Sequence, residues 1–153
     1  SLRAEDSLLP REIQLYIGIP FCPTRCLYCS FTAYPLHQYK NRVDEYLDAM
    51  FKELDWLAAY SKNFIMKNIY IGGGTPTTLS AEHIKVLLES VNKNLVTVPL
   101  NEFTLEAGRP DTIDMEKLNA IKQNGVITPI LVCEAQNGYL GITFHERKGE
   151  KTK

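Results

Sequence analysis

The stretch IQLYIGIPFCPTRCLYCSF, residues 13–31, decides the fold and carries three of the four cysteines of the chain. Apolar side chains occupy every second position at its start, which predicts a strand from about Ile13 to Ile19. Pro20 ends the strand and begins a loop. In that loop the cysteines follow a C-x3-C-x2-C spacing: Cys22, Cys26 and Cys29. We therefore expect three thiols on one loop directly after a strand.

The spacing of these cysteines limits the chemistry that they can perform. It is too tight for disulfide bonds among them, and three thiols are one short of a closed tetrahedral zinc site. Thiolates on one such loop can each hold a different iron of a [4Fe-4S] cluster. One iron then stays free for a small molecule with an amine and a carboxylate. A structural zinc site remains an alternative, with His37 or Cys133 as its fourth ligand.

The rest of the chain alternates between helix and strand periods. In chain order the pattern predicts a helix at about Asn41–Tyr60, a strand at Asn68–Ile71, a helix capped by Ser80, a strand at Glu102–Glu106, and a helix at about Asp114–Gln123 that stops at Gly125. This β-α-β-α-β-α order is typical of an α/β fold with parallel strands and right-handed helical crossovers.

Three regions are expected along the chain: an N-terminal extension at 1–12, a domain at 13–125 and a divergent C-terminal tail at 126–153. The segment VITPILVC in the tail offers a fourth strand, but Pro129 would remove a ladder donor from it. The residues after it have no helical period. We therefore expect an unpaired parallel edge beside the third strand.

Composition narrows the class of protein. The chain has 153 residues, 44% of them hydrophobic, and a formal net charge of −1, which fits one globular domain. This charge predicts no nucleic-acid partner and no anionic membrane surface, and no apolar run approaches the ~20 residues that span a bilayer. Clustered thiols favour a reducing, cytoplasmic location. Because the sequence opens on Ser1, it can be a piece of a longer protein.

Unusual features follow three successive strands. The cysteine loop follows the first strand, GGGTP (Gly72–Pro76) follows the second, and Glu106 ends the third, before AGRP. Because the carboxyl ends of parallel strands meet at one rim, we expect these features to face one pocket. Plainer explanations remain open: the glycines can serve tight packing, and Glu106 and Arg109 can be solvated side chains.

The segments YIGIPFCPTRCLYCSF, IYIGGGTPT and EFTLEAGRPDT together resemble the radical S-adenosylmethionine (SAM) superfamily. More narrowly, they resemble its oxygen-independent coproporphyrinogen III oxidase (dehydrogenase) family, over about Gln14–Gly125. The resemblance implies that 13–125 is the N-terminal part of a partial (β/α)6 barrel, with about three to four βα units. It also implies a [4Fe-4S] cluster on Cys22, Cys26 and Cys29, with SAM on the open iron.

The same resemblance implies which residues surround SAM: Tyr16, Tyr28, Phe31, Gly72, Gly73, Gly74, Thr75 and Glu106. Gly72–Thr75 would lie against the SAM amino group, and Glu106 would match the acidic residue at the end of the third strand. Tyr28 and Phe31 would flank the adenine. Arg109 is expected to contact an acidic substrate or the SAM carboxylate if it is not simply solvated.

By the chemistry of that family, an electron from the reduced cluster splits SAM, and the resulting radical oxidatively decarboxylates propionates of coproporphyrinogen III on the way to haem. The expected partners are this or a related tetrapyrrole and an electron donor such as flavodoxin or ferredoxin. No side chain is assigned a catalytic role. Two alternatives remain: a haem-binding chaperone of the same superfamily and a zinc-binding interaction module. Because later barrel units are missing, we expect a fragment that works poorly alone.

Overall fold

The computed structural model of the chain describes residues 11–26, 29–30, 33–60, 63–126, 128–135 and 138–143. The main sheet has the strand order β1-β4-β5-β6-β7. Its strands are β1 (Arg11–Ile19), β4 (Phe64–Gly73), β5 (Glu102–Glu106), β6 (Thr128–Ala135) and β7 (Gly138–Thr143). The first four pair in parallel, and β7 returns antiparallel to β6. The α/β fold with parallel strands is therefore confirmed.

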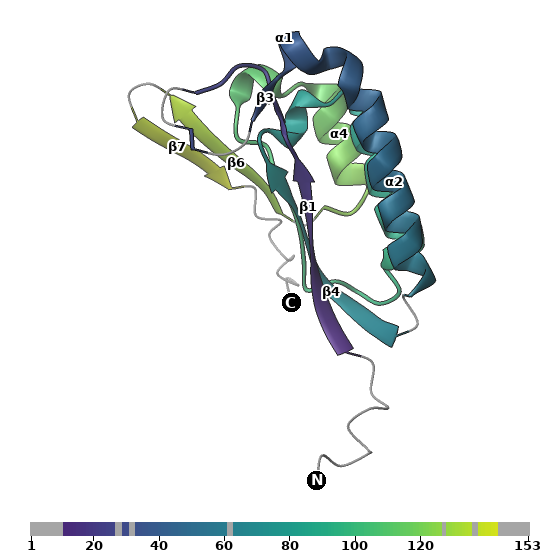
Figure 1. Cartoon of the computed structure of the whole chain (residues 1–153). Helices are drawn as coiled ribbons and strands as arrows, with labels where there is room; N and C mark the ends of the chain where they lie inside the picture. The colour runs from purple at the N-terminus through teal and green to yellow at the C-terminus, as the bar shows by residue number, and fades with distance from the viewer. Residues whose placement is uncertain are drawn as a thin grey trace, which may run out of the picture.

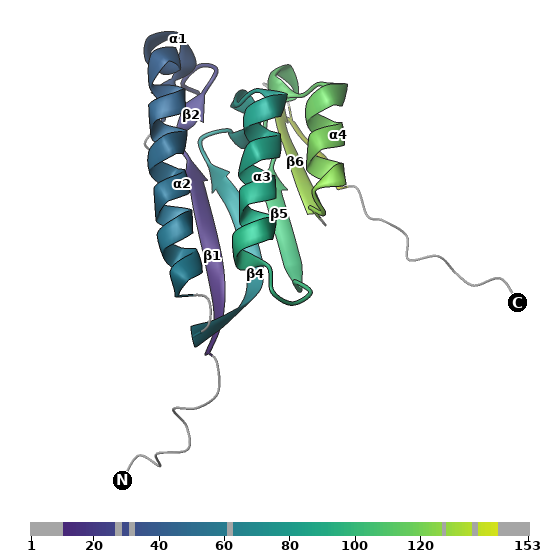
Figure 2. The same ribbon diagram turned by 90° about the vertical axis from the view of Figure 1, so that its right-hand side faces the viewer.

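The described helices all lie on one face of this sheet (Figures 1 and 2). They are α1 (Leu36–Tyr39), α2 (Val43–Ala59), α3 (Ala81–Leu95) and α4 (Met115–Gln123), with a short 3-10 helix η2 (Lys40–Arg42) between α1 and α2. α3 packs between α2 and α4. β1, β4 and β5 follow one another in the sheet in chain order, and helical crossovers join them. Because such crossovers are all right-handed, the connecting helices lie on the same side of the sheet.

The predicted cap at Ser80 and the predicted stop at Gly125 are confirmed, and the structure shows a further cap at Asp114. At the start of α3, the Ser80 hydroxyl oxygen accepts a hydrogen bond of 3.1 Å from the backbone N–H of His83. At the start of α4, the Asp114 carboxylate accepts one of 2.8 Å from the N–H of Lys117. Gly125 follows α4 with a φ of 76°, a conformation that glycine adopts at no steric cost.

The hydrophobic core lies between the sheet and the helices. Side chains from β1, β4 and β5 and from the inner faces of α2, α3 and α4 form one cluster. The apolar stripe of α3 is entirely buried: Ile84, Leu87, Leu88, Val91 and Leu95. Because burying one such side chain contributes about 1.5–3 kcal/mol, this cluster holds the strands in place and fixes the loops at their ends.

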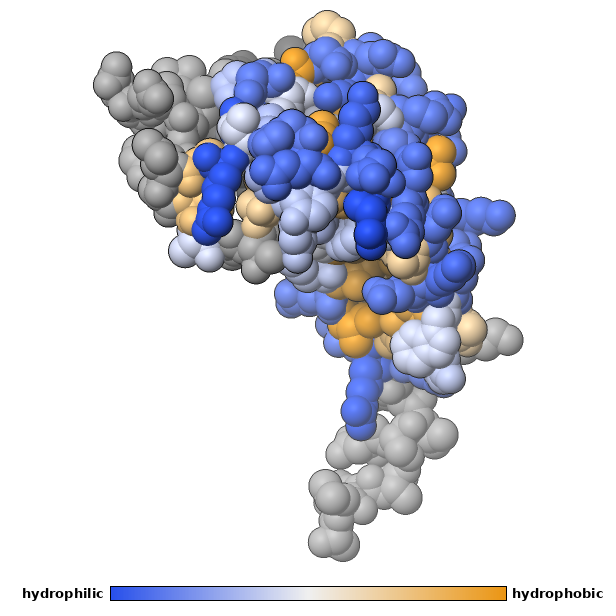
Figure 3. Space-filling view, turned by 45° about the horizontal axis from the view of Figure 1, so that its top comes forward, coloured by the Kyte–Doolittle hydropathy of each residue, from blue (hydrophilic) through white to orange (hydrophobic). Residues whose placement is uncertain are grey.

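The loops at the carboxyl ends of the strands gather at the top of Figure 1. There β2 (Phe21–Cys22) pairs in parallel with β3 (Tyr34–Pro35), the 3-10 helix η4 (Pro76–Thr78) follows β4, and the 3-10 helix η5 (Pro110–Thr112) follows β5. With this end brought forward, the described surface is mostly hydrophilic, and hydrophobic residues show in small areas between hydrophilic ones (Figure 3).

Beyond Gly125 the structure differs from the prediction. β6 contains Pro129, which the sequence analysis took as an argument against a strand, and it pairs with β5 over Thr104–Glu106. β7 pairs with β6 only from Ile130 onward. Pro129 therefore precedes the part of β6 that has neighbours on both sides, where a missing N–H is tolerated. The expectation of an unpaired edge beside the third strand is wrong.

At the amino end, β1 begins at Arg11 and so takes in the last part of the predicted extension. The remainder of that extension and the residues after Thr143 lie outside the described part of the chain. The region boundaries at 12 and 125 stay predictions. No helix in the described ranges combines the length and apolar character needed to cross a membrane.

Candidate functional site

The loops after β1, β4 and β5 are joined to one another by hydrogen bonds. The backbone N–H of Gly74 donates to the carbonyl oxygen of Ile19 at 2.8 Å, and that of Thr75 donates to Phe21 at 2.9 Å. From the third loop, Arg109 Nη1 donates to the carbonyl oxygen of Thr24 at 3.2 Å. The structure therefore brings together the three motifs that the sequence places at strand ends.

Cys22, Cys26 and Cys29 all carry free thiols. Cys22 is buried, and the other two are half-buried, with a 3.1 Å hydrogen bond from the Cys29 N–H to the Cys26 carbonyl oxygen. The Cys22 sulfur lies 3.6 Å from the hydroxyl oxygen of Thr75. Burial raises the pKa of the Cys22 thiol, and the contact with Thr75 offsets part of this rise.

The three thiols suit a cluster of several metal ions. Within the described residues, no group of three or more His, Cys, Asp or Glu side chains could hold one metal ion. A [4Fe-4S] cluster does not need such a group, because each thiolate binds a different iron and the three sulfurs need not converge on one point. Cys22, Cys26 and Cys29 on one loop therefore form a donor set with the chemistry that such a cluster requires.

The glycine loop lies too close to its neighbours to carry side chains. A Cβ on Gly74 would lie 2.7 Å from the Phe21 carbonyl oxygen and 2.8 Å from the Cys22 sulfur. A Cβ on Gly73, where φ is +116°, would lie 2.8 Å from the Ile19 carbonyl oxygen. These glycines let the loop after β4 pack against the cysteine loop. Close packing is therefore sufficient to explain why Gly73 and Gly74 are glycines, which is the alternative that the sequence left open.

On the sheet face away from the helices, two tyrosines lie beside Glu106. The rings of Tyr16 and Tyr70 stack with their centroids 5.8 Å apart, and the Tyr70 hydroxyl donates to Glu106 Oε1 at 2.5 Å. A Cβ on Gly72 would lie 3.0 Å from the carboxyl carbon of Glu106. Burial and the hydrogen bond to Glu106 raise the pKa of Tyr70, so the hydroxyl keeps its proton and stays a donor.

Tyr70 was not among the residues predicted for the site. One signal was available, because residues two apart in a strand point to the same face, which puts Tyr70 beside Gly72. Its partner was not predictable, because Glu106 belongs to another strand and the register between β4 and β5 is known only from the structure.

The Arg109 guanidinium is fixed by hydrogen bonds to Asp111 and Thr24 and is not a freely solvated group. Its Nε and Nη2 donate to the Asp111 carboxylate at 2.9 and 2.6 Å. Its Nη1 donates to the Thr24 hydroxyl oxygen at 3.0 Å and lies 3.8 Å from the Cys26 sulfur. The explanation of Arg109 as a solvated residue is therefore wrong. Its expected contact with a substrate or with the SAM carboxylate stays a prediction.

A second buried network ties the loops after β4 and β5 to α4. The hydroxyl oxygens of Thr77 and Thr112 lie 2.6 Å apart. The Lys117 ammonium donates to the backbone carbonyl oxygens of both threonines at 2.9 Å. This lysine holds η4 and η5 side by side beneath the site.

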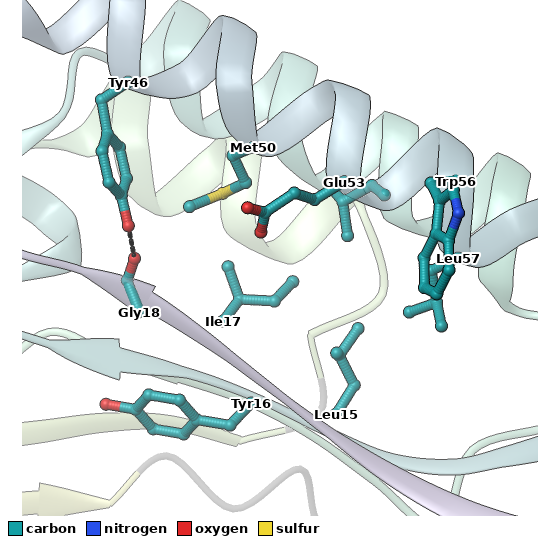
Figure 4. Close-up of a pocket in the computed structure, with 10 residues that line it drawn as sticks. Leu15, Tyr16, Ile17, Gly18, Tyr46, Met50, Glu53, Trp56 and Leu57 are labelled. Atoms are coloured by element: carbon teal, nitrogen blue, oxygen red, sulfur yellow. Dashed lines mark hydrogen bonds between the residues drawn. The ribbon is translucent and has the colours of Figure 1, made fainter.

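A pocket of about 370 Å³ lies between β1 and α2, away from the cysteine loop (Figure 4). Its lining is mainly apolar, and the Tyr46 hydroxyl donates across it to the Gly18 carbonyl oxygen at 2.7 Å. In Figure 4 the Tyr16 ring lies on the opposite side of β1 from Tyr46 and Met50. Because Cys22, Cys26 and Cys29 are not among its lining residues, we place the candidate site at the strand ends and not in this pocket.

The predictions for two site residues and for Cys133 stay untested. Tyr28 and Phe31 lie outside the described residues. Cys133, expected to take no part in metal binding, lies in β6 opposite Leu140 of β7, and its side chain lies outside the described atoms.

Comparisons with known proteins agree with the geometry. The model of the radical SAM superfamily matches residues 16–132. The chain is 42% identical, over 73% of its length, to the oxygen-independent coproporphyrinogen-III oxidase-like protein HemZ of Bacillus subtilis. It is 43% identical, over 72% of its length, to the heme chaperone HemW of the same organism.

A solved structure shares the fold. Coproporphyrinogen III oxidase (HemN) from Escherichia coli, described as a radical SAM enzyme, superimposes with a TM-score of 0.67 at 26% identity over 78% of this chain. The chain covers only 23% of HemZ, 29% of HemW and 27% of the HemN chain. It thus spans about a quarter of the length of the proteins that it matches.

Proposed function

The chain belongs to the radical SAM superfamily, and from this premise we propose that Cys22, Cys26 and Cys29 hold a [4Fe-4S] cluster that binds SAM. The observation that carries the proposal is the set of three free thiols on a loop packed against Gly74 and Thr75. When bound, the cluster supplies the electron for reductive cleavage of SAM.

The residues around the cysteine loop suit the binding of SAM. We propose that the backbone at Gly72–Thr75 lies against its amino group and that Glu106, oriented by Tyr70, binds another polar group of the ligand. Tyr16, stacked on Tyr70, offers an aromatic surface on the same face. By the family resemblance, Tyr28 and Phe31 would flank the adenine. Support for these roles comes from proximity and from the match of motifs.

For the whole protein, we propose an oxidoreductase that decarboxylates the propionates of coproporphyrinogen III or a related tetrapyrrole, in the cytoplasm. A flavodoxin or ferredoxin would be the electron donor. The similarity to HemZ and to the HemN structure supports this function. The similarity to HemW supports a second candidate, a haem chaperone that uses the same cluster site but leaves the tetrapyrrole unchanged.

The first test is anaerobic reconstitution of the chain, with counts of iron and sulfide and an EPR spectrum of the reduced protein with and without SAM. We expect one [4Fe-4S] cluster whose spectrum changes when SAM is added. Single alanine substitutions of Cys22, Cys26 and Cys29 should abolish the iron–sulfur absorbance, whereas Cys133→Ala should leave it intact. A colourless protein with one zinc would instead indicate the interaction module.

A second test separates the two candidates within the superfamily, and it needs the full-length protein. Incubation with SAM, reductant and coproporphyrinogen III should yield 5′-deoxyadenosine and a vinyl product if the protein is an oxidase. Stoichiometric haem binding with no vinyl product would favour the chaperone.

A further inference from the structure

Arg109 connects the loop after β5 with the cysteine loop. The two loops lie 85 positions apart in the sequence at the contact between Arg109 and Thr24. This guanidinium is the side chain through which the third loop reaches the ligand loop, and the proposed function assigns it no role.

The geometry of the guanidinium is set from its own loop. Nε and Nη2 donate in parallel to the two carboxylate oxygens of Asp111. Asp111 lies two residues further along the chain, within η5. Such a two-point ion pair fixes both the position and the plane of the guanidinium. The remaining nitrogen, Nη1, is thereby pointed away from Asp111 and toward the cysteine loop.

Nη1 meets three acceptors on that loop. It donates to the carbonyl oxygen of Thr24 at 3.2 Å and to the Thr24 hydroxyl at 3.0 Å, and it lies 3.8 Å from the sulfur of Cys26. One nitrogen thus holds the backbone just before a ligand residue and donates toward the ligand sulfur itself. The Arg109 side chain is 25% exposed, so its charge is only partly screened by water.

We propose that Arg109 is a positioning residue that holds the cysteine loop ready for the cluster and whose positive charge favours the reduced state of that cluster. The effect on the cluster rests on the proposed function. The attachment of the cysteine loop to Arg109 does not depend on that function. The physical reason is that reduction adds one negative charge. Hydrogen bonds to the ligand sulfurs and nearby charges set the potential of an iron–sulfur centre.

The first measurement is the midpoint potential of the reconstituted cluster, followed by EPR during titration with dithionite, which supplies the single electron. Arg109→Gln should shift the midpoint downward, because the cation next to Cys26 is gone. The matched control is Arg25→Gln, which removes the same charge from an exposed side chain within the cysteine loop. Its downward shift should be smaller, because water screens an exposed charge.

Arg109→Lys separates the effect of the charge from that of the hydrogen-bond geometry. It also replaces Arg109→Gln as the test variant if the glutamine variant folds poorly. Lysine keeps the charge but lacks the planar set of donors that pairs with the Asp111 carboxylate at two points and so fixes the direction of the third donor. The midpoint of this variant should lie between those of the wild type and Arg109→Gln. Equal midpoints in the wild type and both Arg109 variants, or equal shifts in Arg109→Gln and Arg25→Gln, would overturn the proposed effect on the cluster.

The second measurement uses the cluster-free protein. Hydrogen exchange of peptides containing Thr24–Cys26 should be faster in both Arg109 variants than in the wild type, and unchanged in α3. Unchanged exchange in the loop would overturn its proposed attachment to Arg109. A wild-type protein that binds no iron would instead refute the proposed function and the effect on potential together, while the exchange result would still decide whether Arg109 holds the loop.

Discussion

At the scale of single residues, Gly74 shows how little room the site leaves. Its Cα lies where the loop after β4 passes the cysteine loop, and a Cβ there would meet the Phe21 carbonyl oxygen and the Cys22 sulfur at once. A backbone atom has little freedom to move aside. The residue type is therefore dictated by contact between two chain segments.

We predict that Gly74→Ala lowers the free energy of unfolding by about 1–3 kcal/mol, the usual cost of overpacking, and prevents full cluster loading. Thermal unfolding and iron counts measure the two effects. The control is Gly18→Ala, whose Cβ would lie at an ordinary 3.5 Å from the Tyr16 ring. A Gly74→Ala protein with normal stability and normal iron content would contradict the close approach.

A second residue-scale prediction concerns Tyr70→Phe. The change removes the donor that orients Glu106, so the carboxylate must be ordered when SAM binds. We expect SAM affinity to fall by roughly fivefold, about 1 kcal/mol, with the cluster unchanged. Titration of SAM against the reduced cluster measures this.

The control for that experiment is Tyr46→Phe. It also removes a tyrosine hydroxyl that donates a hydrogen bond, but the hydroxyl lies on the opposite side of β1, at the Gly18 carbonyl. SAM affinity in Tyr46→Phe should match the wild type. Equal affinity in Tyr70→Phe and the wild type would mean that Glu106 needs no orientation.

At the scale of elements, α4 shows how a helix can hold loops as well as cover a sheet. Its inner residues join the core, and its Lys117 binds carbonyl oxygens of both η4 and η5. Lys117→Met should lower the free energy of unfolding by about 1.5–3 kcal/mol, because two carbonyls lose a charged donor. Denaturant unfolding is the measurement.

Lys122→Met is the matched control for that prediction, since Lys122 is an exposed lysine of the same helix. Surface substitutions of this kind usually change stability by less than about 0.5 kcal/mol. Similar losses in the two variants would mean that the network beneath the site contributes nothing of its own.

The elements also show how far the sequence could predict the fold. Periodicity and caps located β1, β4 and β5 and the helices α2, α3 and α4. These signals are local: the apolar stripe that includes Leu87 and the cap at Ser80 both belong to the helix that they predict. The sequence left β6 open as a possible fourth strand, since Pro129 argues against a strand unless the limits of the β7 pairing are known. The contacts of Tyr70 with Glu106 and of Arg109 with Thr24 were not predictable either. The first depends on the register between two strands, and the second depends on how two loops pack.

At the scale of the whole molecule, the sheet carries its described helices on one face only. Parallel sheets in proteins are normally covered on both faces. The other face holds Tyr16, 60% exposed, together with Tyr70 and Glu106. Within the described part of the chain, the helices therefore leave this side of the candidate site uncovered.

We therefore predict that this chain, expressed by itself, binds a cluster but does not turn over a tetrapyrrole. A site that is open to water cannot enclose a large substrate or shield a radical. An anaerobic assay with SAM, reductant and coproporphyrinogen III should give no vinyl product above background. Repeated turnovers by a monomer of this chain would show that the described part is already a complete site.

The order of the strands also bears on how the protein is made. β1, β4 and β5 are neighbours in the sheet in the same order as along the chain, so each unit leaving the ribosome finds its packing partner already synthesised. The last of the three joined loops is complete at Thr112. A nascent chain can therefore bring the cysteine loop and the two loops that support it together while the rest is still being translated.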